Sequence, residues 1–220
     1  MSKSPFVVAN HKANKTWEEV RSWLVEISNE TSAFPGTIVF CPSAPFLAST
    51  YSEIKKINSS LQLSAQDISK FEQGAYTGEF AATQIKDFCT YSIIGHSERR
   101  ANFNESENTL SQKVKNAKTA GIEPIFCVQS VENEIPTDVK IVAYEPVFAI
   151  GTGNPDTPAN VKDIAKKLKE KGEFMILYGG SVDAQNVKSF LEPTLIDGVL
   201  IGASNSLDPK KFIAIVQNAA

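Results

Sequence analysis

The feature that most constrains this sequence is a regular alternation of short β-rich runs with helix-patterned segments along all 220 residues. Such alternation is typical of parallel βαβ units. We predict eight strands, over residues 5–10, 37–41, 62–65, 91–94, 123–127, 140–143, 174–177 and 198–201. Eight consecutive units favour a closed (β/α)₈ barrel in one domain covering residues 1–220, compact beside the typical length of about 250 residues. A doubly wound open sheet is the alternative.

Seven of the connections carry helix-boundary signals. They include two capping boxes, two caps followed by proline, and two glycines where left-handed C-terminal residues belong, at Thr16/Glu19, Asn104/Glu107, Thr157-Pro158, Asp208-Pro209, Gly121 and Gly172. The connection after Cys127 differs, because only 12 residues, among them Pro136, precede the sixth predicted strand. A parallel crossover needs roughly 10 to 12 residues. We therefore predict that the helix between strands five and six is shortened or missing.

Charge and cysteine usage exclude several classes of protein. The chain has 22 basic and 25 acidic residues, a net charge of −3, and no basic block of the kind that binds nucleic acid or a membrane surface. No apolar run approaches the roughly 20 residues that span a bilayer. Three cysteines without metal-ligand spacing argue against a disulfide framework or a zinc site. We expect a cytoplasmic protein without metal, nucleic-acid or membrane partners.

Four polar segments stand at the ends of predicted strands. They are NHKAN (10–14), GHSERR (95–100), YEPV (144–147) and YGGSV (178–182). In a βα barrel the C-terminal strand ends meet on one face, and catalytic groups are drawn from several of them. These four segments are therefore the places to look for chemistry.

Three side chains in these segments suit acid–base work on an anionic substrate. Glu145 follows an apolar strand and precedes Pro146, where its carboxylate can enter the barrel mouth and act as a base. His96 precedes a short helical start whose N–H groups disfavour a charged imidazole. Lys12 supplies the local cation that a phosphorylated ligand needs in a chain of negative net charge. Taken singly, each residue also has an ordinary structural explanation.

Together with TGE (77–79), GTG (151–153) and DGVLIG (197–202), these segments resemble the triose-phosphate isomerase family in identity, order and approximate separation over nearly the whole chain. The resemblance implies a TIM barrel enzyme of glycolysis and gluconeogenesis that interconverts dihydroxyacetone phosphate and glyceraldehyde 3-phosphate without a cofactor. It implies that Glu145 removes a proton from the carbon next to the carbonyl group and that neutral His96 polarises that carbonyl group. Lys12 stabilises the phosphate and the enediolate, and Asn10 orients the substrate.

The resemblance also implies the surroundings of the catalytic set. Phosphate binding falls to Asn10, Lys12 and the loop residues Gly151, Ser181, Gly202 and Ala203. Supporting residues are Ser97, Glu98, Tyr178 and Leu200. The lid comprises Pro146, Val147, Phe148, Ala149, Ile150, Gly151 and Thr152, and a homodimer interface involves Thr77, Glu79 and Arg99, with Glu79 meeting Arg99 of the other subunit.

The chain departs from the family pattern at the lid and at the phosphate loops. Phe148 stands where the family commonly has Trp, and Ser130 where it commonly has Glu, so both partners of a plausible lid hydrogen bond are absent together. His11 stands where Trp is frequent. The eighth loop, GASNSL (202–207), is one residue longer than the family's, so Gly202 transfers more securely than Ala203.

Two other functions stay open at this point. A different phosphate-binding barrel enzyme, such as a sugar-phosphate isomerase or an aldolase, would use Ser181 and Gly202 equally well. A noncatalytic binding or scaffold protein could keep the barrel, since a fold does not prove a function. The combination of Asn10, Lys12, His96 and Glu145 favours the isomerase over both.

Overall fold

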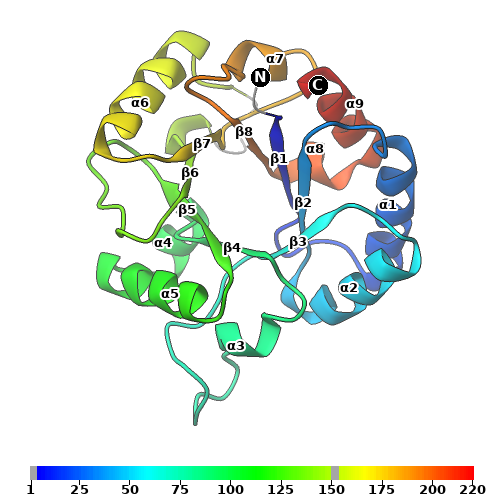
Figure 1. Cartoon of the computed structure of the whole chain (residues 1–220), viewed down its shortest axis with the longest axis vertical. Helices are drawn as coiled ribbons and strands as arrows, with labels where there is room; N and C mark the ends of the chain where they lie inside the picture. Colours follow the sequence, from blue (N-terminus) through cyan, green and yellow to red (C-terminus); the bar gives the residue numbers. More distant parts are fainter. Residues whose placement is uncertain (1–3, 150–153) are drawn as a thin grey trace.

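The computed structural model describes residues 4–149 and 154–220, which form a closed barrel of eight parallel strands surrounded by helices (Figure 1). The strands are β1 (Phe6–Asn10), β2 (Thr37–Cys41), β3 (Gln62–Ala65), β4 (Tyr91–Ile94), β5 (Glu123–Val128), β6 (Ile141–Tyr144), β7 (Met175–Tyr178) and β8 (Gly198–Ile201). They follow chain order, and β1 pairs with both β2 and β8. The predicted (β/α)₈ barrel is confirmed, and the open sheet is excluded.

The helices are α1 (Trp17–Glu30), α2 (Leu47–Lys56), α3 (Ala82–Ile85), α4 (Ser97–Phe103), α5 (Glu107–Thr119), α6 (Pro158–Lys171), α7 (Val187–Phe190), α8 (Ala203–Leu207) and α9 (Pro209–Ala219). Two short 3₁₀ turns, η1 (Ala44–Phe46) and η2 (Val147–Ala149), complete the elements. The capping box at Thr16 is present, since Glu19 Oε2 accepts from the Thr16 backbone N–H at 2.8 Å. Asp208 caps α9 as predicted, its carboxylate accepting from Lys210 N at 2.9 Å.

One predicted helix cap and one predicted backbone conformation are wrong. Asn104 does not cap α5; it ends α4 in the left-handed conformation, with φ 52°, and Ser106 caps α5 by accepting from Thr109 N at 3.3 Å. Gly172 ends α6 with φ 175°, which is extended backbone open to any residue. The error at Asn104 arises because a capping motif within the sequence does not reveal where the preceding helix stops. At Gly172 the predicted helix end is correct, and only the left-handed conformation is not observed.

The connection between β5 and β6 confirms the prediction that its helix is missing. Residues 129–140, all of them described, contain turns and bends but no helix. The Asn133 side-chain oxygen accepts from the backbone N–H groups of Gln129 and Ser130, at 2.8 and 3.1 Å. A side chain therefore satisfies the backbone donors that a helix would otherwise use.

Alternation along the strands separates two apolar clusters. One faces the helices, and the other fills the barrel interior with Phe6, Val8, Val39, Cys41, Ile93, Ile125, Cys127, Ile141, Ala143, Leu177 and Leu200. Because side chains alternate with a period of two, the interior face continues at the C-terminal ends through Asn10, Glu145 and Gly202. The strand pattern itself thus directs these three positions to the mouth of the barrel.

Candidate active site

Glu145 lies directly after β6, with only 1% of its surface exposed. Its backbone N–H donates to Val128 O in β5 at 2.8 Å, which fixes the residue at the strand edge. One carboxylate oxygen, Oε2, accepts from Ser97 N at 2.9 Å, and the other, Oε1, lies 3.2 Å from Nε2 of His96. Two groups from the start of α4 therefore hold a carboxylate that is almost completely removed from water.

His96 is the residue before α4, and its ring is oriented by that helix. Its Nδ1 accepts the backbone N–H of Glu98 at 3.2 Å. Because Nδ1 accepts, the neutral ring carries its proton on Nε2, and this proton points to Oε1 of Glu145. Gly95 makes the turn possible, since its φ of 74° lies in the region that favours glycine. The result is a neutral N–H donor beside a carboxylate.

Lys12 has a strained backbone that its neighbours hold in place. Its φ is 52°, which is uncommon for a residue with a side chain. Its carbonyl oxygen accepts from Ser43 Oγ and from Gln66 Nε2, both at 2.8 Å, and its N–H donates to Asn10 Oδ1 at 2.9 Å. The Lys12 ammonium group forms an ion pair with Glu98. The structure thus connects four predicted site residues, since Glu98 also donates to His96.

The end of β7 and the loop after it are hydrogen-bonded to one residue within the predicted lid and to one residue beyond it. Ser181 Oγ donates to Ala149 O at 2.7 Å, and the Tyr178 hydroxyl oxygen accepts from Asp156 N at 2.9 Å. Burial raises the pKa of Tyr178 to about 12, so its hydroxyl keeps its proton. Pro146 is buried, whereas Val147 and Phe148 are exposed. Of the predicted lid and phosphate residues, Ile150, Gly151 and Thr152 lie outside the described residues.

The loop after β8 approaches Lys12. A Cβ built on Gly202 would lie 3.1 Å from Lys12 Cε, so the glycine leaves room for the lysine stem. Ala203 follows with φ 52° and is exposed at the start of α8. Leu200, in β8 before this loop, is buried in the barrel interior.

Sequence reasoning missed three residues that shape the site. A Cβ on Gly179 would lie 2.9 Å from Glu145 Cγ, so the absence of a side chain there gives the carboxylate its space. Gln66 supports Lys12 from 54 residues away. Cys127 lies on the interior face, where burial and the neighbouring Glu145 carboxylate raise the pKa of its thiol well above the ordinary range. Because side chains alternate along a strand, the sequence could have placed Cys127, near the end of β5, on the interior face of the barrel. No local sequence pattern marks Gln66.

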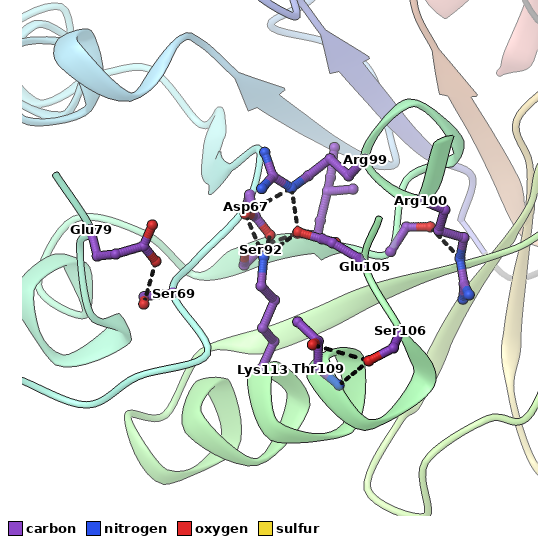
Figure 2. Close-up of polar contacts among 12 residues, drawn as sticks. Asp67, Ser69, Glu79, Ser92, Arg99, Arg100, Glu105, Ser106, Thr109 and Lys113 are labelled. Atoms are coloured by element: carbon purple, nitrogen blue, oxygen red, sulfur yellow. Dashed lines mark hydrogen bonds and ion pairs between the residues drawn. The ribbon is translucent and has the colours of Figure 1, made fainter. Parts of the chain in front are cut away.

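The predicted interface residues lie apart from this constellation. Thr77 and Glu79 belong to the fully exposed stretch 72–79, which protrudes from the barrel beside α3 (Figure 1). Glu79 accepts from Ser69 Oγ at 2.5 Å, while Arg99 Nε contacts Asp67 at 2.8 Å (Figure 2). Within one chain, the structure gives Glu79 and Arg99 different partners.

The described parts of the chain contain neither a candidate metal cluster nor a helix that could span a membrane. Across residues 4–149 and 154–220, no group of three His, Cys, Asp or Glu side chains has the arrangement of a metal site. Among the helices of these ranges, none combines the length and apolar character that crossing a bilayer requires.

Comparison with known proteins gives a consistent result. The family model described as triosephosphate isomerase matches residues 5–219. A triosephosphate isomerase of Dehalococcoides mccartyi is 35% identical over 245 residues, covering 97% of this chain and 96% of that protein. One of Hahella chejuensis is 33% identical over 248 residues, covering 99% of both. A solved triosephosphate isomerase structure from Bartonella henselae superposes with a TM-score of 0.84 at 26% identity, covering 98% of both chains.

Proposed function

Because the chain belongs to the triosephosphate isomerase family and is therefore an aldose–ketose isomerase of triose phosphates, we propose that it works through an enediolate made by Glu145 and His96. The observation that carries this proposal is the contact of 3.2 Å between Glu145 Oε1 and His96 Nε2. A buried base and a neutral donor stand side by side, as proton transfer between adjacent carbons requires. The substrates are dihydroxyacetone phosphate and glyceraldehyde 3-phosphate.

In the first step, the Glu145 carboxylate removes a proton from the carbon next to the substrate carbonyl. The two C–H electrons form the carbon–carbon double bond of the enediolate, and the carbonyl oxygen gains the negative charge. In the free protein, Nε2–H of His96 faces Glu145. With substrate bound, it donates instead to the negatively charged substrate oxygen and stabilises it. His96 then gives its Nε2 proton to this oxygen and takes the proton of the neighbouring hydroxyl group, whose oxygen becomes the new carbonyl oxygen. Glu145 returns its proton to the former carbonyl carbon, which completes the isomerisation.

Lys12 supplies positive charge beside the reacting oxygens and the phosphate. Its ion pair with Glu98 directs the ammonium group towards the start of α4, next to which His96 lies. Asn10 orients the Lys12 backbone through its side-chain oxygen, at 2.9 Å from Lys12 N. Electrostatic stabilisation by a preorganised cation is often the largest contribution to catalysis. We assign phosphate binding to Lys12 and to the loops at Ser181, Gly202 and Ala203.

The lid follows Glu145 directly, so closing it moves a segment attached to the base. The hydrogen bond from Ser181 to Ala149 attaches the described part of this segment to the loop after β7, and Asp156, beyond the lid, donates to Tyr178. Exclusion of water protects the enediolate from losing its phosphate and strengthens the charge interactions of the site.

The test is a coupled assay with glyceraldehyde 3-phosphate, run in H₂O and in D₂O. We expect fast turnover, and we expect the product formed in D₂O to carry deuterium on the carbon that receives the proton, because Glu145 exchanges its proton with solvent. Mass spectrometry of the product measures this incorporation. Absence of turnover would refute the activity, and turnover without any deuterium would refute the shuttle.

We further propose that the protein is a homodimer in which the protruding stretch 72–79 contacts the other subunit. The exposure of this stretch and the exposed Phe103, whose ring Arg99 covers at 4.6 Å, support an interface on this side. Sedimentation should give twice the chain mass of 24.0 kDa. Thr77→Arg should shift the protein towards monomer, whereas Ser32→Arg on the exposed turn after α1 should not. A fully active wild-type monomer would contradict this proposal.

We also propose a cytoplasmic role in glycolysis and gluconeogenesis. All three cysteines are buried free thiols, and burial raises the pKa values of Cys41 and Cys89 to about 12. Protonated, inaccessible thiols suit a reducing compartment and react slowly with oxidants.

A further inference from the structure

The loop after β8 is hydrogen-bonded to the loops on both of its sides. On one side, Ser206 Oγ donates to Asn10 O at 2.8 Å, and His11 Nε2 lies 3.0 Å from Ser206 O. On the other side, Asn205 Nδ2 donates to Val182 O at 2.7 Å. Two adjacent residues of the eighth loop thus join the end of β1 to the loop after β7. We call His11, Asn205 and Ser206 the eighth-loop bracket.

The position of His11 is set by two aromatic rings. It is 0% exposed, and its ring meets Trp23 and Phe40 edge-on, with centroids 4.7 and 4.6 Å apart. Burial lowers the pKa of His11 to about 4, so the ring is neutral at neutral pH. Since Ser206 O can only accept, the proton resides on Nε2 and is donated to it.

Placing a polar ring here has a cost. Nδ1 of His11 is buried and has no hydrogen-bond partner in the described structure. A buried unsatisfied acceptor costs about 1–3 kcal/mol, and an apolar ring would fill the space without it. Within the described structure, the hydrogen bond to Ser206 O is the one polar contact of the His11 ring, and it distinguishes His11 from an apolar ring. This contact therefore points to a role in holding the eighth loop.

The eighth loop needs outside support because it cannot order itself. Helix α8 has 5 residues, and isolated helices shorter than about 12 residues are marginal in water. Its first residue, Ala203, has φ 52°, a conformation that neighbouring contacts must maintain. Ser206 Oγ also lies 3.1 Å from Ala203 O, so the bracket reaches the strained residue directly.

We propose that the eighth-loop bracket sets the affinity for the phosphate group of the substrate by fixing Gly202 and Ala203 beside Lys12. The close approach of Gly202 to Lys12 Cε, 3.1 Å for a Cβ at that glycine, ties the loop position to the lysine. The inference rests on the proposed phosphate site. His11, Asn205 and Ser206 are positioning residues, since they act through the loop and not on the reacting atoms.

The test compares His11→Phe with His11→Gln. Phe keeps an aromatic ring against the stacked rings of Trp23 and Phe40 but cannot donate to Ser206 O, whereas the Gln amide N–H can. Without the bond, phosphate binding must also order the loop. We expect His11→Phe to raise the Kd for inorganic phosphate, measured by calorimetry, and the KM for glyceraldehyde 3-phosphate by about 5- to 10-fold, the range of one net hydrogen bond. His11→Gln should restore most of this affinity.

Asn205→Ala is the second variant, because Asn205 is only partly buried and its loss leaves the core intact. It should weaken phosphate binding in the same direction. Thr31→Val is the matched control, since it removes a buried hydroxyl that donates to Ile27 O at 2.7 Å at the end of α1. This control should lose stability without losing phosphate affinity.

The outcomes separate this inference from the proposed function. Phosphate affinity in folded His11→Phe and Asn205→Ala equal to that of wild type would overturn the inference, and so would an equal loss of affinity in Thr31→Val. If wild type binds phosphate more tightly than His11→Phe and Asn205→Ala but does not turn over glyceraldehyde 3-phosphate, the proposed activity is refuted and the role of the bracket is still supported.

Discussion

Replacing Glu145 with Asp is expected to lower kcat for glyceraldehyde 3-phosphate by at least about 100-fold. The substitution keeps the carboxylate but retracts it by one methylene from a position where Ser97 N and His96 Nε2 hold its two oxygens at 2.9 and 3.2 Å. A misplacement of about 1 Å at a reacting group can cost on the order of 100-fold in rate. The loss should appear mainly in kcat, because Lys12 and the phosphate loops still bind the substrate.

Steady-state kinetics on purified variants measure this effect, and circular dichroism verifies the fold. Glu145→Gln extends the test, because it keeps the length of the side chain while removing the base, and general acid–base catalysis is typically worth 10²- to 10⁴-fold. Glu173→Asp, at an exposed position before β7, is the control for shortening a glutamate. A kcat for Glu145→Asp within threefold of wild type would show that another group removes the proton.

The position of Glu145 illustrates what the sequence predicts well. An apolar strand with alternating side chains places Ile141 and Ala143 in the barrel interior, and the same parity carries on to Glu145. Four of the eight predicted strands match the structure residue for residue, and the other four differ by one residue at their ends. Strand ends are where the side chains of a barrel converge, so placing the strands correctly also places Asn10, His96 and Glu145 on one face.

Contacts between distant segments could not be predicted in the same way. His11 and Ser206 are 195 residues apart, and only closure of the barrel between β1 and β8 brings them together. Gln66 reaches Lys12 O because β3, which precedes Gln66, lies one strand away from β1 across β2. Gly179 matters because a side chain there would meet Glu145 Cγ. Local periodicity and capping rules describe neighbours along the chain, whereas these contacts depend on the packing of a finished barrel.

A cluster of four charged residues behind the site is another long-range arrangement that the sequence did not indicate. Lys113 on α5 donates to both oxygens of Asp67, at 2.7 and 2.6 Å, and to Glu105 at 2.6 Å (Figure 2). Arg99 Nε contacts the same two carboxylates, at 2.8 and 2.7 Å. The side chains of Lys113 and Glu105 are each only 5% exposed. Two cations and two anions thus balance their charges, with Lys113 and Glu105 almost fully buried and Arg99 30% exposed.

The two carboxyl groups of this cluster are not equivalent. Burial raises the pKa of Asp67 to about 6. Burial acts in the same direction on Glu105, but Lys113 and Arg99 outweigh it and hold the pKa of Glu105 below its ordinary value. Asp67 is therefore the first member of the cluster to take up a proton as the pH falls.

Lys113→Met is expected to destabilise the protein by about 3–5 kcal/mol at pH 7, the cost of removing one partner from buried ion pairs. Met nearly conserves the volume of the side chain, so the change isolates the charge. Arg99 would remain as the one cation of the cluster facing both Asp67 and Glu105. Urea denaturation measures the loss. Lys118→Met on the same helix is the matched control, because its pair with Glu123, at 2.8 Å, is more exposed and should be worth about 0–1 kcal/mol.

The pH dependence of the stability of Lys113→Met separates two causes of its loss. A packing defect destabilises the protein equally at all pH values, whereas the effect of an unpaired carboxylate depends on pH. Without Lys113, the pKa of Asp67 rises further in the folded state while its unfolded value stays near 4. A carboxyl group whose folded pKa is raised binds protons preferentially in the folded state, so its destabilising effect shrinks as the pH falls from 7 towards 5. The stability difference between Lys113→Met and wild type should therefore narrow in that window, and adding Asp67→Asn should remove most of it at pH 7. A difference that stays constant with pH would instead identify the loss as packing, and it would show that the cluster does not act through its charge.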